Sequence, residues 1–122
     1  KRRIKGAAVL TGEKRDFFNS SNVINLEHPL FDDGALIFDD LKSDELTLES
    51  DKGSKKVIMN FKGFPYMGIW TRGGTNSNLI CLEPWYGVDS TEGDSPEWVK
   101  KEGLIQLEDG AEFNSFYTIK VL

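Results

Sequence analysis

The chain has 122 residues, a formal net charge of −5 and 39% hydrophobic residues. This length suits one domain, and this composition argues against a chain that is disordered throughout. With one Cys and one His, the sequence can form no internal disulfide and no zinc site made of Cys and His alone. No apolar run approaches the roughly 20 residues of a membrane-spanning helix, so we expect no membrane partner.

Charge and cysteine content bear on partners and location. Nine acidic residues and one basic residue, Lys42, lie between Glu27 and Asp51. Such a segment repels a phosphate backbone, so we expect no nucleic-acid partner. A single unpaired Cys is typical of a reducing compartment, which predicts a cytoplasmic location.

Hydrophobic periodicity predicts β-strands along most of the chain. In chain order, they cover residues 3–10, 23–26, 35–38, 46–50, 57–61, 66–70, 79–83 and 113–121. One short helix is expected near 95–101, where Ser95 precedes a proline and lysines follow. Short strands separated by loops indicate an all-β fold, as an antiparallel β-sandwich or barrel.

Glu83 is the strongest candidate for chemistry. It follows the apolar run 79–82, in which Cys81 is interpreted as a small core residue. A carboxylate at the end of a buried strand is partly desolvated, which suits it to general acid or base work. A strand-end glutamate that forms a salt bridge with a loop gives the same pattern, so the spacing leaves both interpretations open.

Aromatic and acidic side chains are candidates for ligand contacts. Aromatic rings pack on the C–H faces of sugars, and four residues could form such a wall or simply pack in the core: Trp70, Trp85, Tyr86 and Trp98. Asp32 and Asp33 precede an apolar strand, where they fit either a turn or hydrogen bonds to ligand hydroxyls. His28 has no partner at a recognisable spacing and is interpreted as structural. Residues 72–75, Arg-Gly-Gly-Thr, favour a hairpin loop over a phosphate site.

Two segments carry a family resemblance. Residues 64–70, Phe-Pro-Tyr-Met-Gly-Ile-Trp, and 80–87, Ile-Cys-Leu-Glu-Pro-Trp-Tyr-Gly, resemble the aldose 1-epimerase (galactose mutarotase) family, in its branch of uncharacterised bacterial members. Residues 30–38 and 101–113 match the same branch, so the resemblance covers nearly the whole chain from about Ile24 onward.

The resemblance implies a large antiparallel β-sandwich, or supersandwich, that interconverts the α and β anomers of an aldose. Glu83 occupies the position of the glutamate that removes the anomeric proton. Asp33 aligns with a substrate-binding aspartate, with Asp32 as its rival, and Trp70 and Trp85 are expected to contact the substrate. Neither a metal nor an organic cofactor is implied. The substrate is an aldose sugar or a sugar phosphate.

The family's histidines are expected upstream of residue 1, and His28 lies in neither of their motifs. The resemblance therefore implies that residues 1–122 are the C-terminal portion of an isomerase, inactive alone and completed by the missing N-terminal half. The alternative is a non-catalytic carbohydrate-binding β-sandwich module. A third interpretation is an interaction domain whose aromatic residues form a protein interface.

Overall fold

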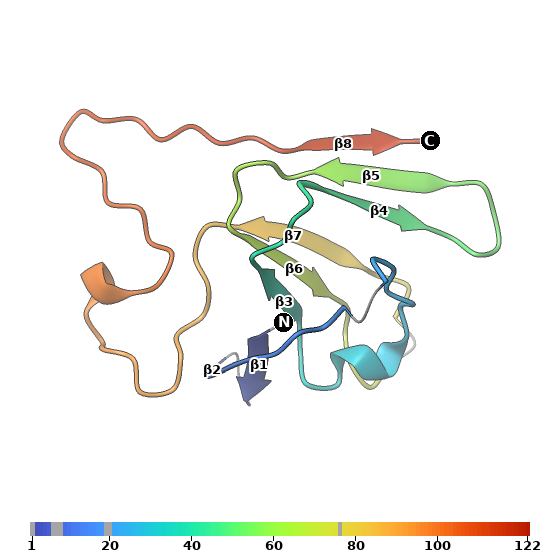
Figure 1. Ribbon diagram of the computed structural model, residues 1–122, viewed down its shortest axis with the longest axis horizontal. Coiled ribbons are helices and arrows are strands. Elements are labelled where there is room, and N and C mark those ends of the chain that lie inside the picture. Colours follow the sequence, from blue (N-terminus) through green and yellow to red (C-terminus); the bar gives the residue numbers. More distant parts are fainter. Residues whose placement is uncertain (1, 6–8, 19–20, 76) are drawn as a thin grey trace.

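The computed structural model describes residues 2–5, 9–18, 21–75 and 77–122, and its strands form two antiparallel sheets (Figure 1). The first sheet has the order β2-β1-β3-β6-β7, with bounds β1 Arg2–Lys5, β2 Val9–Lys14, β3 Leu36–Asp39, β6 Tyr66–Trp70 and β7 Cys81–Trp85. The second has the order β4-β5-β8, with bounds β4 Glu45–Glu49, β5 Lys56–Asn60 and β8 Thr118–Val121. The predicted antiparallel β-sandwich is confirmed.

A hydrophobic core fills the space between the sheets. Because side chains alternate along a strand, every second residue of β3 and β6 faces this core. Its buried members are Phe31, Leu36, Phe38, Met59, Phe61, Met67 and Ile69. Burying each such side chain contributes roughly 1.5–3 kcal/mol, so this cluster holds the two layers together. We call the face of the first sheet that meets this core the inner face.

The opposite face of the first sheet, the outer face, is buried in part. Ile37 of β3 and Tyr66 of β6 pack there with Leu10 and Val88, and Trp85 lies against this cluster. β3 is therefore buried on both faces, which explains why its first three residues are all apolar instead of alternating with polar ones.

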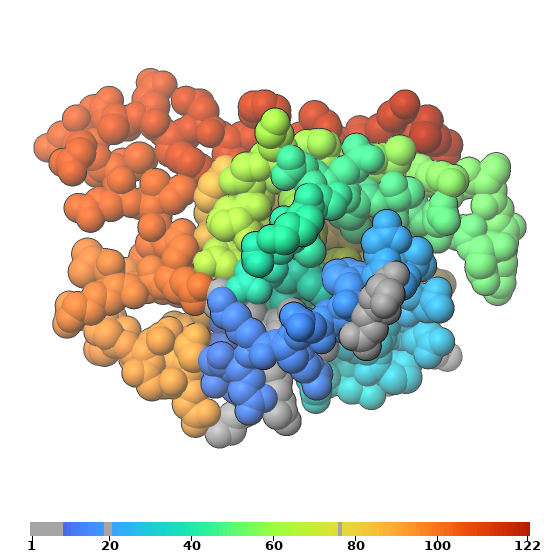
Figure 2. Space-filling model, viewed as in Figure 1, coloured from blue at the N-terminus to red at the C-terminus, as the bar shows by residue number. Residues whose placement is uncertain are grey.

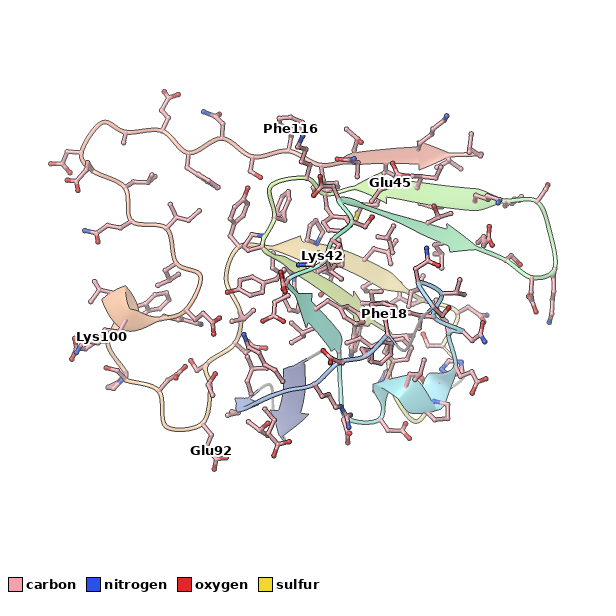
Figure 3. All side chains as sticks on the ribbon, viewed as in Figure 1. Phe18, Lys42, Glu45, Glu92, Lys100 and Phe116 are labelled. Atoms are coloured by element: carbon pink, nitrogen blue, oxygen red, sulfur yellow. The ribbon has the colours of Figure 1, made fainter. Side chains whose placement is uncertain are left out.

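A long excursion links β7 to β8 and stands to one side of the body (Figures 1 and 2). Backbone hydrogen bonds join Leu10 to Ser90 (2.9 Å) and to Glu92 (2.8 Å) at its start. Farther along, the Tyr66 hydroxyl donates to Glu102 Oε1 at 3.0 Å. Between these two attachments, residues 93–101 form a loop that carries Lys100 outward (Figure 3).

Several sequence predictions need correction. The strand predicted over 3–10 is two strands, β1 and β2, and residues 6–8 lie outside the described part. Within the described residues, 23–26 belong to no strand and Val23 is 68% exposed. The strand predicted over 113–121 is paired only as β8, from Thr118. The β4, β5 and β6 predictions agree with the structure to within a residue.

Helical structure in the described residues is limited to 3-10 turns. The short helix expected near 95–101 is η2, Trp98–Lys100. The Ser95 hydroxyl accepts a hydrogen bond from the Glu97 amide (3.3 Å). Glu97, the cap residue of η2, makes no side-chain capping bond, and its carboxylate accepts from the Lys100 ammonium at 2.9 Å. A second 3-10 turn, η1 (His28–Phe31), was not predicted from the sequence; it has a proline near its start. No helix in the described residues is long and apolar enough to cross a membrane.

Candidate functional site on the outer face

Glu83 lies on the outer face of the first sheet, in the edge strand β7, which pairs with β6. The register pairs Gly68 with Glu83, and Ile37 of β3 pairs with Gly68 on the other side. Since Ile37 belongs to the outer-face cluster, Gly68 and Glu83 share that face with it. Glu83 is half-buried, and its partner in the register, Gly68, has no side chain.

The indole of Trp85 covers this glycine. A Cβ atom added at Gly68 would lie 2.9 Å from Cζ2 of Trp85 and 3.0 Å from its Cη2. Trp85 is two residues beyond Glu83, so both side chains point to the outer face. The missing side chain at Gly68 thus lets the ring lie against the sheet next to the carboxylate.

A separate open pocket of about 650 Å³ adjoins this region. One wall of the pocket is the buried side chain of Phe31, at the end of η1. A second wall is the half-buried side chain of Trp70. Gly73 packs close to η1, since a Cβ there would lie 2.7 Å from the Phe31 carbonyl oxygen. The remaining lining residues are Asp32, Asp33, Gly34 and Gly74.

Trp70 connects the pocket with the Glu83 region. It pairs with Cys81 on the outer face, one same-face position away from Gly68. The structure therefore brings Trp70, Asp32 and Asp33 together in the pocket, and it places Glu83 and Trp85 on the adjoining outer face. A ligand that reached from one group to the other would cross Trp70 and Cys81.

The other two members of the predicted aromatic wall lie elsewhere. Tyr86 packs its ring on Phe64 (4.7 Å between centroids) and on Phe113 (4.9 Å), and its hydroxyl accepts a hydrogen bond from Ser115. Trp98 is 75% exposed on η2, with the Lys101 ammonium 5.9 Å from its ring centroid. Tyr86 therefore packs in a cluster of aromatic side chains, and the side chain of Trp98 projects from the loop into solvent.

Cys81 corrects a prediction. The sequence interpretation placed it in the core, but it pairs with Trp70 on the outer face, two residues before Glu83. Burial raises the pKa of the Cys81 thiol above its ordinary value, and the negative charge of Glu83 raises it further. The i, i+2 spacing of the two residues was the signal that could have identified this contact.

His28 begins η1 and is half-buried. Its Nδ1 atom is buried without a hydrogen-bond partner among the described residues. Sequence reasoning also missed the part that Gly73 and Gly74 play in lining the pocket. Across the described ranges, no group of three His, Cys, Asp or Glu side chains comes together in a way that could hold a metal ion.

No family model matches the chain. It is 32% identical over 79 residues to chromosomal protein LacX of Lactococcus lactis subsp. lactis and 34% identical over 80 residues to plasmid protein LacX of the same organism. Each match covers 65% of this chain and 26% of the relative. The chain thus spans about a quarter of the length of these relatives.

A solved structure matches almost the whole chain. It is a galactose mutarotase related enzyme from Lactobacillus acidophilus, with a TM-score of 0.88 and 27% sequence identity. The match covers 99% of this chain and 41% of the solved one. The likeness in fold confirms the resemblance that segments 64–70 and 80–87 indicate.

Proposed function

Since this chain resembles the galactose mutarotase family in sequence motifs and in fold, we propose that it supplies the glutamate base of a carbohydrate mutarotase. The observation that carries the proposal is the place of Glu83. Glu83 lies on the outer face opposite Gly68 in the register, and the ring of Trp85 packs over that glycine. A half-buried glutamate on the face that carries an aromatic ring suits proton abstraction from a bound sugar hydroxyl.

In the proposed reaction, Glu83 takes the proton from the anomeric hydroxyl. The bond between the anomeric carbon and the ring oxygen breaks, and an acid protonates that oxygen. Rotation about the adjacent carbon–carbon bond and reclosure, with the protons returned, give the other anomer. The family resemblance implies a histidine as the acid, supplied from outside residues 1–122. A base held in place without its acid completes only half of this step.

The pocket supports a sugar hydroxyl as the ligand group at its acidic end. Carboxylate oxygens accept hydrogen bonds from hydroxyls, and we assign this task to Asp33 with Asp32 as its rival. Two carboxylates would repel a phosphate there. We therefore propose a neutral aldose at this end of the site, with any phosphate group of the substrate directed elsewhere. Trp70 and Trp85 supply the apolar contact surface.

We further propose that residues 1–122 are the C-terminal portion of a larger sandwich whose remaining part is their main partner. The solved relative is more than twice as long as its matched part. Near the second sheet, Phe116 is 81% exposed (Figure 3) and Val121 is 73% exposed. Exposed apolar side chains of this kind support a covering polypeptide. The single Cys supports a cytoplasmic location.

Polarimetry on the protein that contains this chain tests the proposal. With freshly dissolved α-glucose or α-galactose, we expect accelerated mutarotation. Glu83→Gln removes the base and should lower the rate about 10²- to 10⁴-fold. The exposed Glu112→Gln is the matched control, because it makes the same chemical change at a residue that lies in neither sheet and does not line the pocket, and it should keep the full rate.

Three results would contradict the assignment. Full activity in Glu83→Gln would exclude Glu83 as the base. Sugar binding without any rate effect in the wild type would favour the non-catalytic carbohydrate-binding module. A sugar titration that leaves Trp85 fluorescence unchanged and produces no mutarotation would favour the interaction domain.

A further inference from the structure

The second sheet ends at β8, which pairs with β5 on one side and with no other strand in the described part of the chain (Figure 1). Two backbone hydrogen bonds join Lys56 and Leu122, at 3.0 and 2.9 Å, and show which pairs of this ladder are hydrogen-bonded. Such pairs alternate with non-hydrogen-bonded ones along antiparallel strands. The N–H and C=O groups of Ile119 and Val121 therefore point away from β5, to the free edge of the sheet.

The side chains of the same two residues are apolar and exposed. Ile119 is 54% exposed and Val121 is 73% exposed. Ile119 lies opposite Met59, a member of the core between the sheets, so both side chains point to the core side of the second sheet. Val121, two residues farther along, points to the same side. β8 thus carries the side chains of a buried strand, although the first sheet does not cover it.

The other sheet edges have features that discourage further pairing. Backbone hydrogen bonds from residues 90–92 to Leu10 cover β2. β7 contains Pro84, which has no N–H group to donate, and prolines in sheets are typical of edge strands. In β4, the same alternation directs to the free edge the backbone groups of residues with polar side chains, which are Glu45, Thr47 and Glu49. At β8, the backbone groups at the edge belong to apolar residues.

We propose that the part of the polypeptide outside residues 1–122 adds a strand to the free edge of β8. This proposal rests on one element of the proposed function, that residues 1–122 are a portion of a larger sandwich. The match covers 41% of the solved relative, so more than half of that chain lies outside it and can supply the strand. The added strand pairs with the backbone of Ile119 and Val121. Its apolar residues extend the core, and they alternate with polar residues on the side of Lys120.

Hydrogen exchange on the protein that contains this chain tests the pairing. The Lys120 amide bonds to β5 and is the internal control, because its protection does not depend on the added strand. We expect the amides of Ile119 and Val121 to exchange within about tenfold of the Lys120 rate. Exchange more than about 100-fold faster than at Lys120 would show a bare edge and overturn the proposal. Protection that disappears on dilution to a monomer would also overturn it, because a second copy would then be the partner.

A charge placed on each side of β8 tests whether its core side is covered. Val121→Lys should lower the Tm of that protein by roughly 5 °C or more, because the added strand buries the position. Thr118→Lys, on the polar side of the same strand, is the matched control and should lower it by less than about 2 °C. Equal shifts would overturn the proposal, and if Val121→Lys does not fold, the exchange rates of the wild type decide.

Neither measurement uses mutarotase activity. A wild type that is inactive but has slow exchange at Ile119 and Val121 would refute the proposed function and support the added strand. An active wild type with a bare β8 edge would do the reverse.

Discussion

The two faces of the β6–β7 pair are built to different requirements. On the inner face, Met67 and Ile69 meet Leu82 in a core where only shape and apolar character matter. On the outer face, Glu83 lies beside a bare glycine and a tryptophan ring. The same strands therefore supply both a rigid support and a set of groups that are held out of the core. Substitutions on the two faces should separate stability from function.

The largest effect on stability is expected on the inner face. Met67 is 1% exposed in the core between the sheets, so Met67→Ala leaves a cavity and should lower the free energy of unfolding by about 2–5 kcal/mol. Urea denaturation followed by circular dichroism measures this loss. Thr47→Ala, on an exposed position of β4, should change stability by less than about 0.5 kcal/mol. Similar stability for Met67→Ala and wild type would refute the position of this core.

A smaller effect is expected at the glycine of the outer face. Gly68→Ala forces the Trp85 ring to move, at a cost of about 1–3 kcal/mol. The tryptophan emission spectrum should shift because the ring leaves its place over Gly68. Under the proposed function, sugar affinity should fall as well. Gly53→Ala is the matched control, since a Cβ there meets no atom within 4 Å. An unchanged emission spectrum in Gly68→Ala would contradict the contact between the ring and the glycine.

The smallest effect concerns the attachment of the long loop to the outer face. Tyr66→Phe removes the hydroxyl that donates to Glu102 Oε1 and should cost about 1 kcal/mol. Hydrogen exchange near residues 101–103 should become faster, because the loop loses a hydrogen bond that joins it to β6. Tyr117→Phe removes a hydroxyl from a side chain that is 51% exposed and should leave this exchange unchanged. Equal exchange rates in the two variants would rule out the attachment.

Strands were predictable from the sequence where their apolar residues alone account for their burial. Residues 66–70 carry large apolar side chains on both faces and form β6 with the predicted bounds. Residues 113–117 alternate just as regularly, yet Phe116 is 81% exposed and the ladder begins only at Thr118. Alternation specifies which residues share a face, but a ladder also needs a neighbouring strand, and no local pattern supplies one.

The candidate site was predictable in part for a related reason. The i, i+2 spacing places Glu83 and Trp85 on one face of a strand without any tertiary information. The glycine opposite Glu83 depends on the register between β6 and β7, which only the folded chain defines. Likewise, the approach of Gly73 to Phe31 joins segments about forty residues apart and leaves no mark in either local sequence.

The loop between the two attachments of the long excursion has a practical consequence. Its ends are fixed by the Leu10 backbone bonds and by Tyr66, so residues 93–101 behave as a closed loop whose length adds little to its entropic cost. Fluorophores or short tags inserted near Glu97 should therefore leave both sheets undisturbed. The same exposed turn offers proteases a point of entry that is remote from Glu83.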